Sequence, residues 1–257
     1  MTQPGRLFLV PTPLDLGSPD QVALDQVLPL GTVTQAAQIT HWICENAKSA
    51  RAFLKRVNAC VPLSAPISSQ HLIELPREAH KSGDHLSDPD IAHGLDPIAQ
   101  GHDVGLLSEA GMPAVADPGS SVVRAAHRLG IRVVPLIGPS SPLMALAASG
   151  MNGQCFAFWG YLPIEAPSRV AAIERIEALS RQLGQAQMFI EVPHRNASLF
   201  QTLIATLKPD THLTLASNLS QASETIRSMP VSDWKRHATQ LDKQQVTMFV
   251  VGHWPKR

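Results

Sequence analysis

The sequence predicts an α/β fold. Two apolar runs of strand length, Val104 to Leu107 and Arg132 to Ile137, each end in a loop of small residues. Each loop leads into a segment of helical composition, Ser120 to Leu129 and Ser141 to Ser149. This repeated order of strand, loop and helix is typical of a parallel sheet covered by helices. Ligands of such sheets bind at the carboxyl ends of the strands, so these two loops predict the position of a site.

The length and apolar content of the chain predict two domains. Its acidic and basic residues balance. The chain has 257 residues, 44% of them apolar, and we expect an N-terminal α/β domain of residues 1–150 and a C-terminal α/β domain of residues 151–257. The 21 basic and 21 acidic residues give no net charge, which removes the simple electrostatic argument for nucleic acid or membrane. Three cysteines without a CxxC spacing, and an N-terminal apolar run of only four residues, predict a cytoplasmic protein without a disulfide framework or membrane span.

The first half begins with a strand at Leu7 to Val10, followed by the loop PTPLDLGS, whose two prolines make it stiff. Thr34 to Ile43 alternates weakly, which favours a second strand, and Ala47 to Val57 has the spacing of a helix. Ser64 to Asp103 has little pattern and is expected to be mostly loop, with a short helix or strand inside it.

The second half alternates strands and helices more clearly. Gly184 is expected to end a helix, and Pro230 restricts the segment SETIRSMPVSDW to the edge of a sheet. The expected strands are Cys155 to Trp159, Met188 to Val192, His212 to Ala216 and Val246 to Val251, and the expected helices are Ser168 to Leu183 and Ser198 to Leu207.

The segment from Ser64 to Asp103 mixes histidines with aspartates, which raises the question of a metal site. No pair has HxH or HExxH spacing, so we predict no metal. The residues concerned are His71, His80, His85, His93, His102, Asp84, Asp88, Asp90, Asp96 and Asp103.

One basic stripe follows from the predicted helix over Ala47 to Val57. Lys48, Arg51 and Lys55 stand at i, i+3 and i+7 and share one face, with Arg56 beside them. A solvated helix face explains such a stripe, and so does an anionic partner such as RNA. Lys48 and Arg51 are therefore candidate substrate-binding residues.

The two central loops offer backbone groups and small side chains in place of a known nucleotide motif. The chain has no GxGxxG after its first strand, no GxxxxGK[ST] and no GxSxG. Such loops suit a ligand of mixed polarity, for example an adenosine. Candidate acid or base groups are Glu109, Asp117, Glu191 and His194, although Glu109 and Asp117 also fit a role in capping their own loop.

Four motifs in order resemble a known family. LLSEAGMPAVADPG, VVPLIGPSSPLMALAASG, FWGYLP and IEVPHRNASLFQTL are similar to motifs of the tetrapyrrole-methylase-like S-adenosylmethionine methyltransferases, in particular of the ribosomal small-subunit RNA 2′-O-ribose methyltransferase I branch. The resemblance implies two α/β domains with the cofactor S-adenosyl-L-methionine in a cleft between them, and a homodimer. It also implies cofactor contacts by Pro13, Ala110, Gly111, Met112, Val115, Ser140, Ser141, Glu191 and Leu219.

The resemblance implies a methyl transfer to a ribose hydroxyl of ribosomal RNA. Glu109 or Glu191 is then the expected general base, and His194 or Arg195 the group that positions an anion. The ribosomal branch has EDTR where this chain reads Glu45 to Lys48, and ELTK where it reads Asn218 to Gln221. These departures keep two alternatives open: methyl transfer to a small, tetrapyrrole-like molecule, or a diverged relative that binds the cofactor without turnover.

Overall fold

The computed structural model describes residues 4–15, 21–76, 88–237, 241 and 245–254, and only the backbone of 88–92. The end of the predicted PTPLDLGS loop, His80, His85 and Asp84 lie outside the described residues. The chain divides into two compact units, Met1–Ser140 and Ser141–Arg257. Each unit has its own sheet and core, and each is described here by itself.

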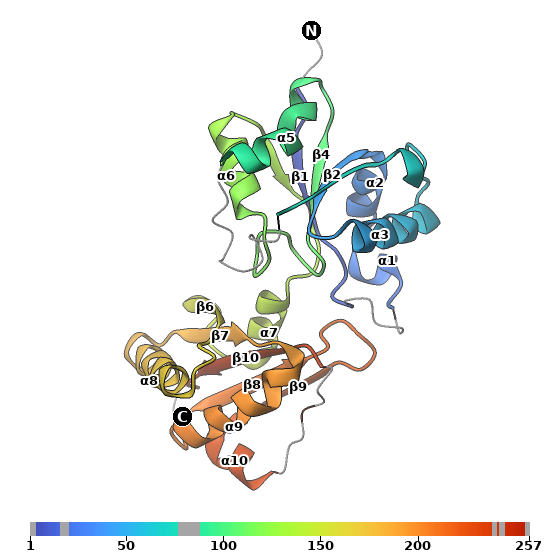
Figure 1. Ribbon diagram of the computed structural model, residues 1–257. Helices are drawn as coiled ribbons and strands as arrows, with labels where there is room; N and C mark the ends of the chain where they lie inside the picture. Colours follow the sequence, from blue (N-terminus) through green and yellow to red (C-terminus); the bar gives the residue numbers. More distant parts are fainter. Residues whose placement is uncertain (1–3, 16–20, 77–87, 238–240, 242–244, 255–257) are drawn as a thin grey trace. The chain divides into compact units, whose positions relative to one another are not determined.

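The first unit contains the predicted parallel sheet (Figure 1). Its strand order is β3-β2-β4-β1-β5, and every pair of neighbours is parallel. All strand carboxyl ends therefore meet at one edge, as the strand, loop and helix pattern predicted. The strands are β1 (Leu7–Val10), β2 (His41–Cys44), β3 (His71–Glu74), β4 (Val104–Leu107) and β5 (Val133–Pro135).

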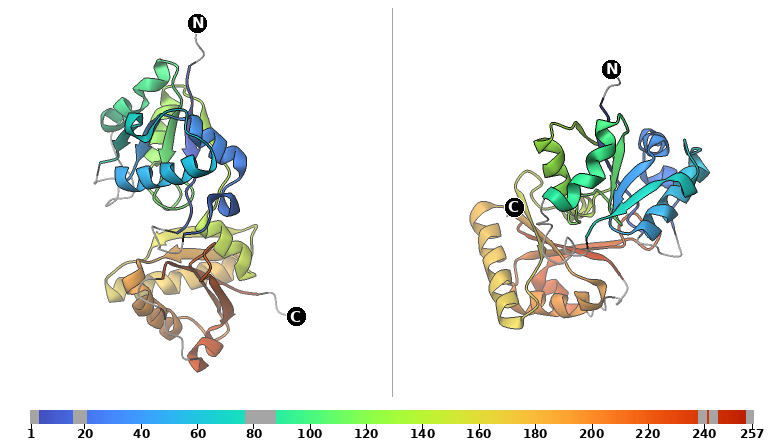
Figure 2. Two further views of the ribbon diagram at one scale, coloured as in Figure 1. Left: turned by 90° about the vertical axis from the view of Figure 1, so that its right-hand side faces the viewer. Right: turned by 45° about the horizontal axis from the view of Figure 1, so that its top comes forward.

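Helices cover both faces of this sheet (Figure 1, Figure 2). On one face, α1 (Leu24–Val27), α2 (Leu30–Gln38) and α3 (Ala47–Cys60) enclose a core that contains Trp42 and Leu54. On the other face, α5 (Asp88–Ala99) and α6 (Ser120–Arg128) enclose a core that contains Leu106 and Val122. The sheet separates two apolar layers, so its strands are continuous apolar runs.

Two expectations for the first unit were wrong. Thr34 to Ile43 is not one strand, because α2 continues to Gln38 and β2 begins only at His41. The buried positions Thr32, Val33, Ala36 and Ala37 repeat with helical spacing, a signal that the weak alternation concealed. Residues 64–103 hold more structure than expected: the 3-10 turn η1 (Ile67–Ser69), β3 and α5, with Pro97 inside the last turn of α5.

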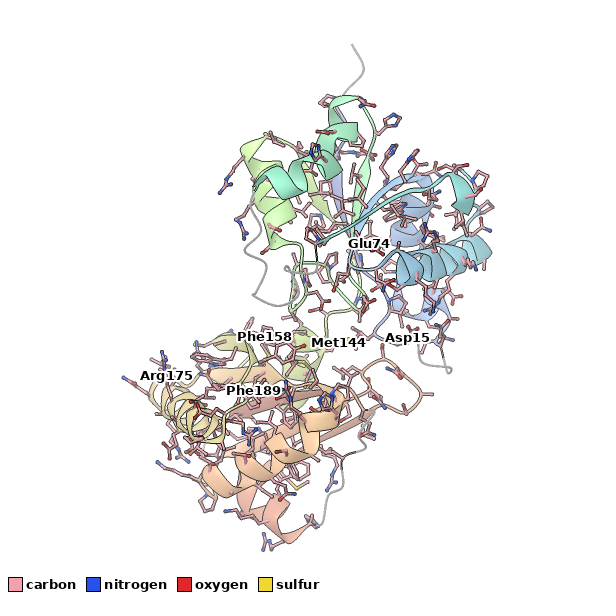
Figure 3. All side chains as sticks on the ribbon, in the orientation of Figure 1. Asp15, Glu74, Met144, Phe158, Arg175 and Phe189 are labelled. Atoms are coloured by element: carbon pink, nitrogen blue, oxygen red, sulfur yellow. The ribbon has the colours of Figure 1, made fainter. Side chains whose placement is uncertain are left out.

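The second unit is a mixed sheet of order β6-β7-β10-β8-β9, parallel only between β6 and β7. Pro230 ends the edge strand β9, as predicted, and Gly184 ends α8 in the left-handed conformation. Phe189 lies in the core of this unit and stacks on Phe249 at 5.7 Å between ring centroids (Figure 3). The elements are β6 (Phe156–Tyr161), α8 (Ala166–Leu183), β7 (Ala186–Ile190), η2 (Pro193–Arg195), α9 (Asn196–Thr206), β8 (His212–Ser217), β9 (Thr225–Pro230), α10 (Val231–Arg236) and β10 (Thr247–Gly252).

Helix α7 (Ser141–Ser149) belongs to the second unit, whereas the expected boundary after residue 150 assigns it to the first. It packs on β7, β8, β9 and β10, and Ser228 Oγ donates a hydrogen bond of 3.0 Å to the carbonyl oxygen of Ser149. The apolar stripe of α7 thus covers a sheet that follows it in sequence. Local sequence cannot reveal which of the two sheets α7 covers.

None of the helices in the described ranges has both the length and the apolar composition to cross a bilayer.

A glycine in the first sheet gives a direct test of its packing. A Cβ added at Gly105 of β4 would lie 2.4 Å from the buried Trp42 ring, whose Nε1 is held by Gln70 Oε1 at 2.9 Å. Gly105→Ala is therefore expected to lower the free energy of unfolding by about 1 to 3 kcal/mol. Gly31→Ala is the control, because its Cβ meets nothing within 4 Å and helix propensity favours alanine by up to about 1 kcal/mol. Equal urea midpoints for the two variants would contradict this account.

Candidate functional site

The candidate site is built on three loops that follow β1, β4 and β5 in the first unit. Thr12 and Gly111 form an isolated antiparallel bridge, in which each backbone N–H donates to the other carbonyl oxygen at 3.0 Å. A Cβ added at Gly138 would lie 2.3 Å from the Pro11 ring, and one added at Gly111 would lie 3.4 Å from the Pro139 carbonyl oxygen. The structure thus brings together the loops of Pro13, Gly111 and Ser140 that the sequence analysis assigned to one ligand.

The loop after β4 is held in an unusual backbone conformation. Ala114 has φ 63° and Ala116 has φ 65°, values that favour glycine, and the Gly111 φ is 80°. Ser108 Oγ donates to the Gly111 carbonyl oxygen at 3.1 Å, which fixes the start of the loop. In the second unit Asn218 and Ser220, on either side of the buried Leu219, also have positive φ. Every non-glycine residue with positive φ in the described ranges lies in a loop predicted to touch the cofactor, and such backbone strain is concentrated at functional sites.

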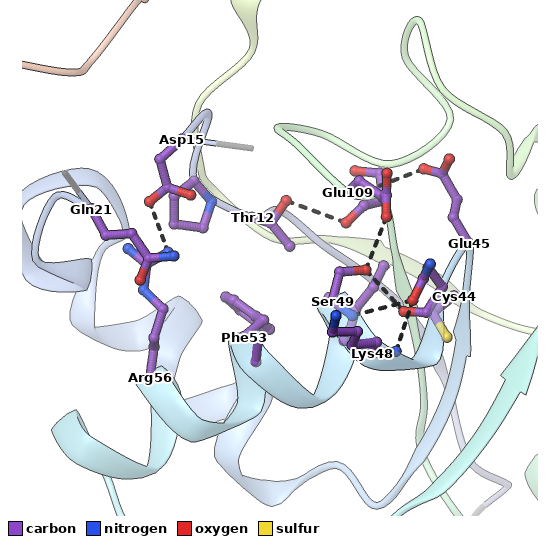
Figure 4. Close-up of a pocket in the computed structure, with 16 residues that line it drawn as sticks. Thr12, Asp15, Gln21, Cys44, Glu45, Lys48, Ser49, Phe53, Arg56 and Glu109 are labelled. Carbon is purple, nitrogen blue, oxygen red and sulfur yellow. Dashed lines mark hydrogen bonds and ion pairs between the residues drawn. The ribbon is translucent and has the colours of Figure 1, made fainter. Parts of the chain in front are cut away.

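A cavity of about 310 Å³ opens beside these loops, at the carboxyl ends of β1, β2 and β4 (Figure 4). β2 and β4 are neighbours, and the helices that follow them lie on opposite faces of the sheet. This is the crevice where parallel sheets bind ligands. Its lining includes the predicted Pro13, Lys48 and Glu109, with these further residues: Thr12, Asp15, Gln21, Cys44, Glu45, Asn46, Ser49, Ala50, Ala52, Phe53, Arg56, Leu107 and Ser108.

Glu109 is held on the cavity wall by the segment after β2. Ser49 Oγ donates to Glu109 Oε1 at 3.1 Å, and the backbone N–H of Glu109 donates to Glu45 Oε1 at 3.1 Å (Figure 4). The first turn of α3 is fixed in turn, because Asn46 Oδ1 accepts from the backbone N–H groups of Lys48 and Ser49. The sequence analysis did not single out Glu45 and Ser49, although Glu45 directly follows an apolar strand.

A third acid, Asp117, stands near Glu45 and Glu109. Its pKa is raised to about 7, first because burial disfavours the charged form and then because both glutamates are negative, with partial compensation by a hydrogen bond to Ser108. Asp117 was one of four candidate acid or base groups on sequence grounds. A carboxyl group that titrates near neutral pH is suited to accept a proton in a reaction.

The other predicted acid lies in the second unit. Glu191 is 1% exposed, and its Oε1 accepts from Arg195 Nη2 at 2.7 Å and from Arg195 Nε at 3.0 Å. The backbone N–H of Val192 donates to the same oxygen. Arg195 thus has an acidic partner four residues away in its own segment. His194, between them, is exposed.

The predicted basic stripe on α3 is present but smaller than expected. Lys48, Arg51 and Lys55 are exposed. Arg56 differs, because its Nη1 contacts Asp15 Oδ2 at 2.8 Å and its Nη2 donates to the Val22 carbonyl oxygen at 2.6 Å. Arg56 therefore fixes the loop after β1 and does not extend the stripe.

Among the described residues, no three His, Cys, Asp or Glu side chains are grouped to hold a metal ion. His71 and His102, from the histidine-rich segment, instead pack beside His41, with ring centroids 4.6 Å and 4.8 Å from its ring. These rings lie at the amino ends of the strands, at the sheet edge opposite the cavity.

Asp117 predicts a pH dependence of stability. Its folded pKa of about 7 lies above the ordinary value of about 4, so between these values the folded protein keeps a proton that the unfolded chain has lost. The free energy of unfolding contributed by this group therefore falls as pH rises from about 4 to about 7. Asp117→Asn removes the effect, so its melting temperature relative to the parent should rise between pH 5 and pH 8. A difference that stays constant across this range would contradict the assignment.

Comparison with curated proteins gives relatives over nearly the whole chain. "Ribosomal RNA small subunit methyltransferase I" of Escherichia coli O157:H7 is 29% identical over 97% of this chain and 78% of its own length. The protein of the same name from Vibrio cholerae is 28% identical over 96% of this chain and 77% of its own length. The one from Pseudomonas aeruginosa is 35% identical over 59% of this chain and 54% of its own length.

Solved structures agree on the fold. The methyltransferase CobJ matches with a TM-score of 0.58 and 17% identity, covering 97% of this chain and 94% of its own. Uroporphyrin III C-methyl transferase from Thermus thermophilus matches with a TM-score of 0.53 and 16% identity, covering 96% and 97%. A family model described as Tetrapyrrole (Corrin/Porphyrin) Methylases matches residues 42–234, three quarters of the chain. The chain therefore belongs to the tetrapyrrole methylase family of methyltransferases, which confirms the predicted family and fold class.

Proposed function

We propose that this methyltransferase uses S-adenosyl-L-methionine to methylate a ribose 2′-hydroxyl of ribosomal RNA. The observation that carries the proposal is the meeting of three small-residue loops beside an acid-lined cavity, at the edge where parallel sheets bind ligands. The names of relatives that align with nearly the whole chain support ribosomal RNA as the substrate. A ribosomal substrate also implies a cytoplasmic protein.

The residues of the loops after β1, β4 and β5 are suited to bind S-adenosyl-L-methionine. Ser140 Oγ is buried without a hydrogen-bond partner in the described part of the chain, so a bound ligand would satisfy it. The loop of Gly111 is closely packed, since an added Cβ would lie 3.0 Å from Leu14 Cδ2. When bound, the cofactor supplies a methyl group already activated by a positive sulfur. We assign its contacts to Pro13, Ala110, Gly111, Met112, Val115, Ser140, Ser141 and Leu219.

The acidic residues in and near the cavity are suited to accept the proton that the ribose hydroxyl loses. As the ribose oxygen bonds to the methyl carbon and the carbon–sulfur bond breaks, the hydroxyl proton must pass to a base. Glu109 lines the cavity, and Asp117 nearby has a pKa of about 7. Glu191 is less suited to this role, because Arg195 occupies its carboxylate. We therefore assign the base to Glu109 or Asp117, and to Glu191 a part in fixing its own loop.

The charges of the cavity favour a nucleoside over a tetrapyrrole. Beside the ion pair of Asp15 with Arg56, the cavity wall carries the carboxylates of Glu45 and Glu109 and the ammonium group of Lys48. A tetrapyrrole with several carboxylates would be repelled by such a wall, whereas a ribose and base are neutral. The phosphates of the RNA would then lie on the exposed basic stripe of Lys48, Arg51 and Lys55.

A methyl-transfer assay tests the function and the cofactor loops together. The parent should transfer labelled methyl groups to small-subunit ribosomal RNA, and the modified position should resist alkaline cleavage, because a methylated 2′-oxygen cannot attack the adjacent phosphate. S-adenosylhomocysteine at about 100 times its Kd should add about 2.7 kcal/mol to stability. Gly111→Leu should lose both properties, since a side chain at this position would press on Leu14 and displace the loop that is proposed to hold the cofactor.

Gly184→Leu is the matched control. Gly184 has φ 60° and its Cβ meets nothing within 4 Å, so this variant carries the backbone cost of a left-handed leucine without filling the site. Normal ligand binding by Gly111→Leu would mean that the site is misplaced. Ligand binding by the parent without transfer to RNA would instead favour a small-molecule acceptor or a relative without turnover.

We also propose a homodimer, as the family resemblance implies. Large apolar side chains at and after the edge strand β6 support it, because Phe156, Tyr161 and Ile164 are 42%, 55% and 67% exposed. Sedimentation equilibrium should give about twice the chain mass of 27.7 kDa. A monomer at every micromolar concentration would count against the dimer.

A further inference from the structure

The cavity in the first unit has two ends of different chemistry. Ser49, Phe53 and Arg56 stand at i, i+4 and i+7 of α3, so they share one face of the helix and line the cavity in a row about 10 Å long. Ser49 marks the end at which the proposed proton acceptor lies. Asp15 and Gln21 lie at the other end beside Arg56, and Phe53 lies between the two ends (Figure 4). We call Asp15, Gln21, Phe53 and Arg56 the far end of the cavity.

The far end suits an uncharged ligand. The Arg56 guanidinium contacts Asp15 Oδ2 at 2.8 Å and donates to the Val22 carbonyl oxygen at 2.6 Å. Arg56 and Asp15 therefore balance each other, and the Asp15 side chain is only 7% exposed. A phosphate would compete with the carboxylate for the guanidinium, whereas a neutral group can bind beside the intact ion pair.

Two side chains of the far end keep hydrogen-bonding groups for a ligand. Asp15 Oδ1 accepts no hydrogen bond from the described residues, because Arg56 contacts the other oxygen. The Gln21 amide forms none within the part of the chain that the structure describes, and it offers two N–H donors and one acceptor. Phe53 adds an aromatic ring to the wall. These groups together suit a flat molecule with donors and acceptors along its edge.

A nucleobase is a molecule of this kind. Proteins that recognise RNA by sequence stack an unpaired base on an aromatic side chain and form hydrogen bonds to its Watson–Crick edge. Enzymes that modify a base also draw it out of the stack into a pocket. The cavity of about 310 Å³ is at the small end of the range of ligand sites, so it suits a single nucleoside.

We infer that the far end of the cavity binds the base of the reacting nucleotide and selects a base with an amino group beside a ring-nitrogen acceptor. This inference rests on the proposed function, because it takes the ribose of the same nucleotide as the methyl acceptor. In cytosine and adenine, the amine would donate to Asp15 Oδ1 and the neighbouring ring nitrogen would accept from the Gln21 amide. Uracil and guanine carry the reverse order, an oxygen beside an N–H, so their oxygen would face the carboxylate. A site left with unpaired polar groups rejects such a base strongly.

The base at the methylated position tests the inference on the full chain. After transfer of labelled methyl groups to small-subunit ribosomal RNA, the labelled nucleoside should be 2′-O-methylcytidine or 2′-O-methyladenosine. A transcript with that cytidine changed to uridine, or that adenosine changed to guanosine, should lose about tenfold or more in kcat/KM. Each change keeps the size of the ring system and reverses the order of donor and acceptor.

A variant of Gln21 tests the assigned residue. Gln21→Ala should lower the preference between the two transcripts about threefold or more, because the donor to the ring nitrogen is lost. Gln26→Ala is the matched control, because Gln26 is equally exposed and lies on α1 outside the cavity lining. Both variants should be stabilised by S-adenosylhomocysteine like the parent.

The outcomes separate the base site from the function. If the parent methylates RNA at a uridine or guanosine, the inference is overturned while the proposed function stands. The same holds if the changed transcript reacts like the original, or if Gln21→Ala keeps the preference that Gln26→Ala shows. If Gln21→Ala alone loses stabilisation by S-adenosylhomocysteine, the far end holds the cofactor and the inference is again overturned. A parent that methylates no RNA refutes the proposed function itself, and the inference with it.

Discussion

The parallel arrangement of the first sheet is the constraint on which the rest of the candidate site depends. Because all its strands run the same way, the loops after β1, β2, β4 and β5 emerge at one edge. The backbone bridge between Thr12 and Gly111 then joins two of these loops directly. An added side chain at Gly138 would collide with the Pro11 ring and one at Gly111 would press on Leu14, which explains the two glycines in physical terms.

The carboxyl edge of the first sheet also brings acidic side chains close together. Glu45, Glu109 and Asp117 come from two separate loops, and burial, together with the two neighbouring glutamates, raises the pKa of Asp117 to about 7. Such a group is costly for stability at neutral pH, because it must either keep a proton or remain charged among like charges. The Arg56 ion pair to Asp15 and the Arg195 ion pair to Glu191 show the opposite arrangement, in which an acid is balanced and serves the fold. Glu109 lines the cavity and Asp117 lies near it, so these two acids are the candidates for chemistry.

The basic residues follow a similar division. Arg56 and Arg195 form ion pairs with Asp15 and Glu191, while the outer face of α3 presents the exposed Lys48, Arg51 and Lys55. A chain with no net charge can thus offer a local basic surface beside a cavity whose wall carries acids. This distribution suits a substrate whose phosphates are anionic and whose reacting sugar is neutral.

The sequence by itself determined the α/β class, the family and most elements of the central stretch, because strand, loop and helix follow one another there with clear local periodicity. It also identified the loops of Gly111 and Ser140, since runs of small residues after apolar strands are a local signal. It failed where the signal was not local. The pairing of α7 with the second sheet, the ion pair of Arg56 with Asp15, and the grouping of Glu45 with Asp117 all depend on which distant segments become neighbours. Those contacts are set by the burial of apolar faces across the whole chain, and only the tertiary structure decides them.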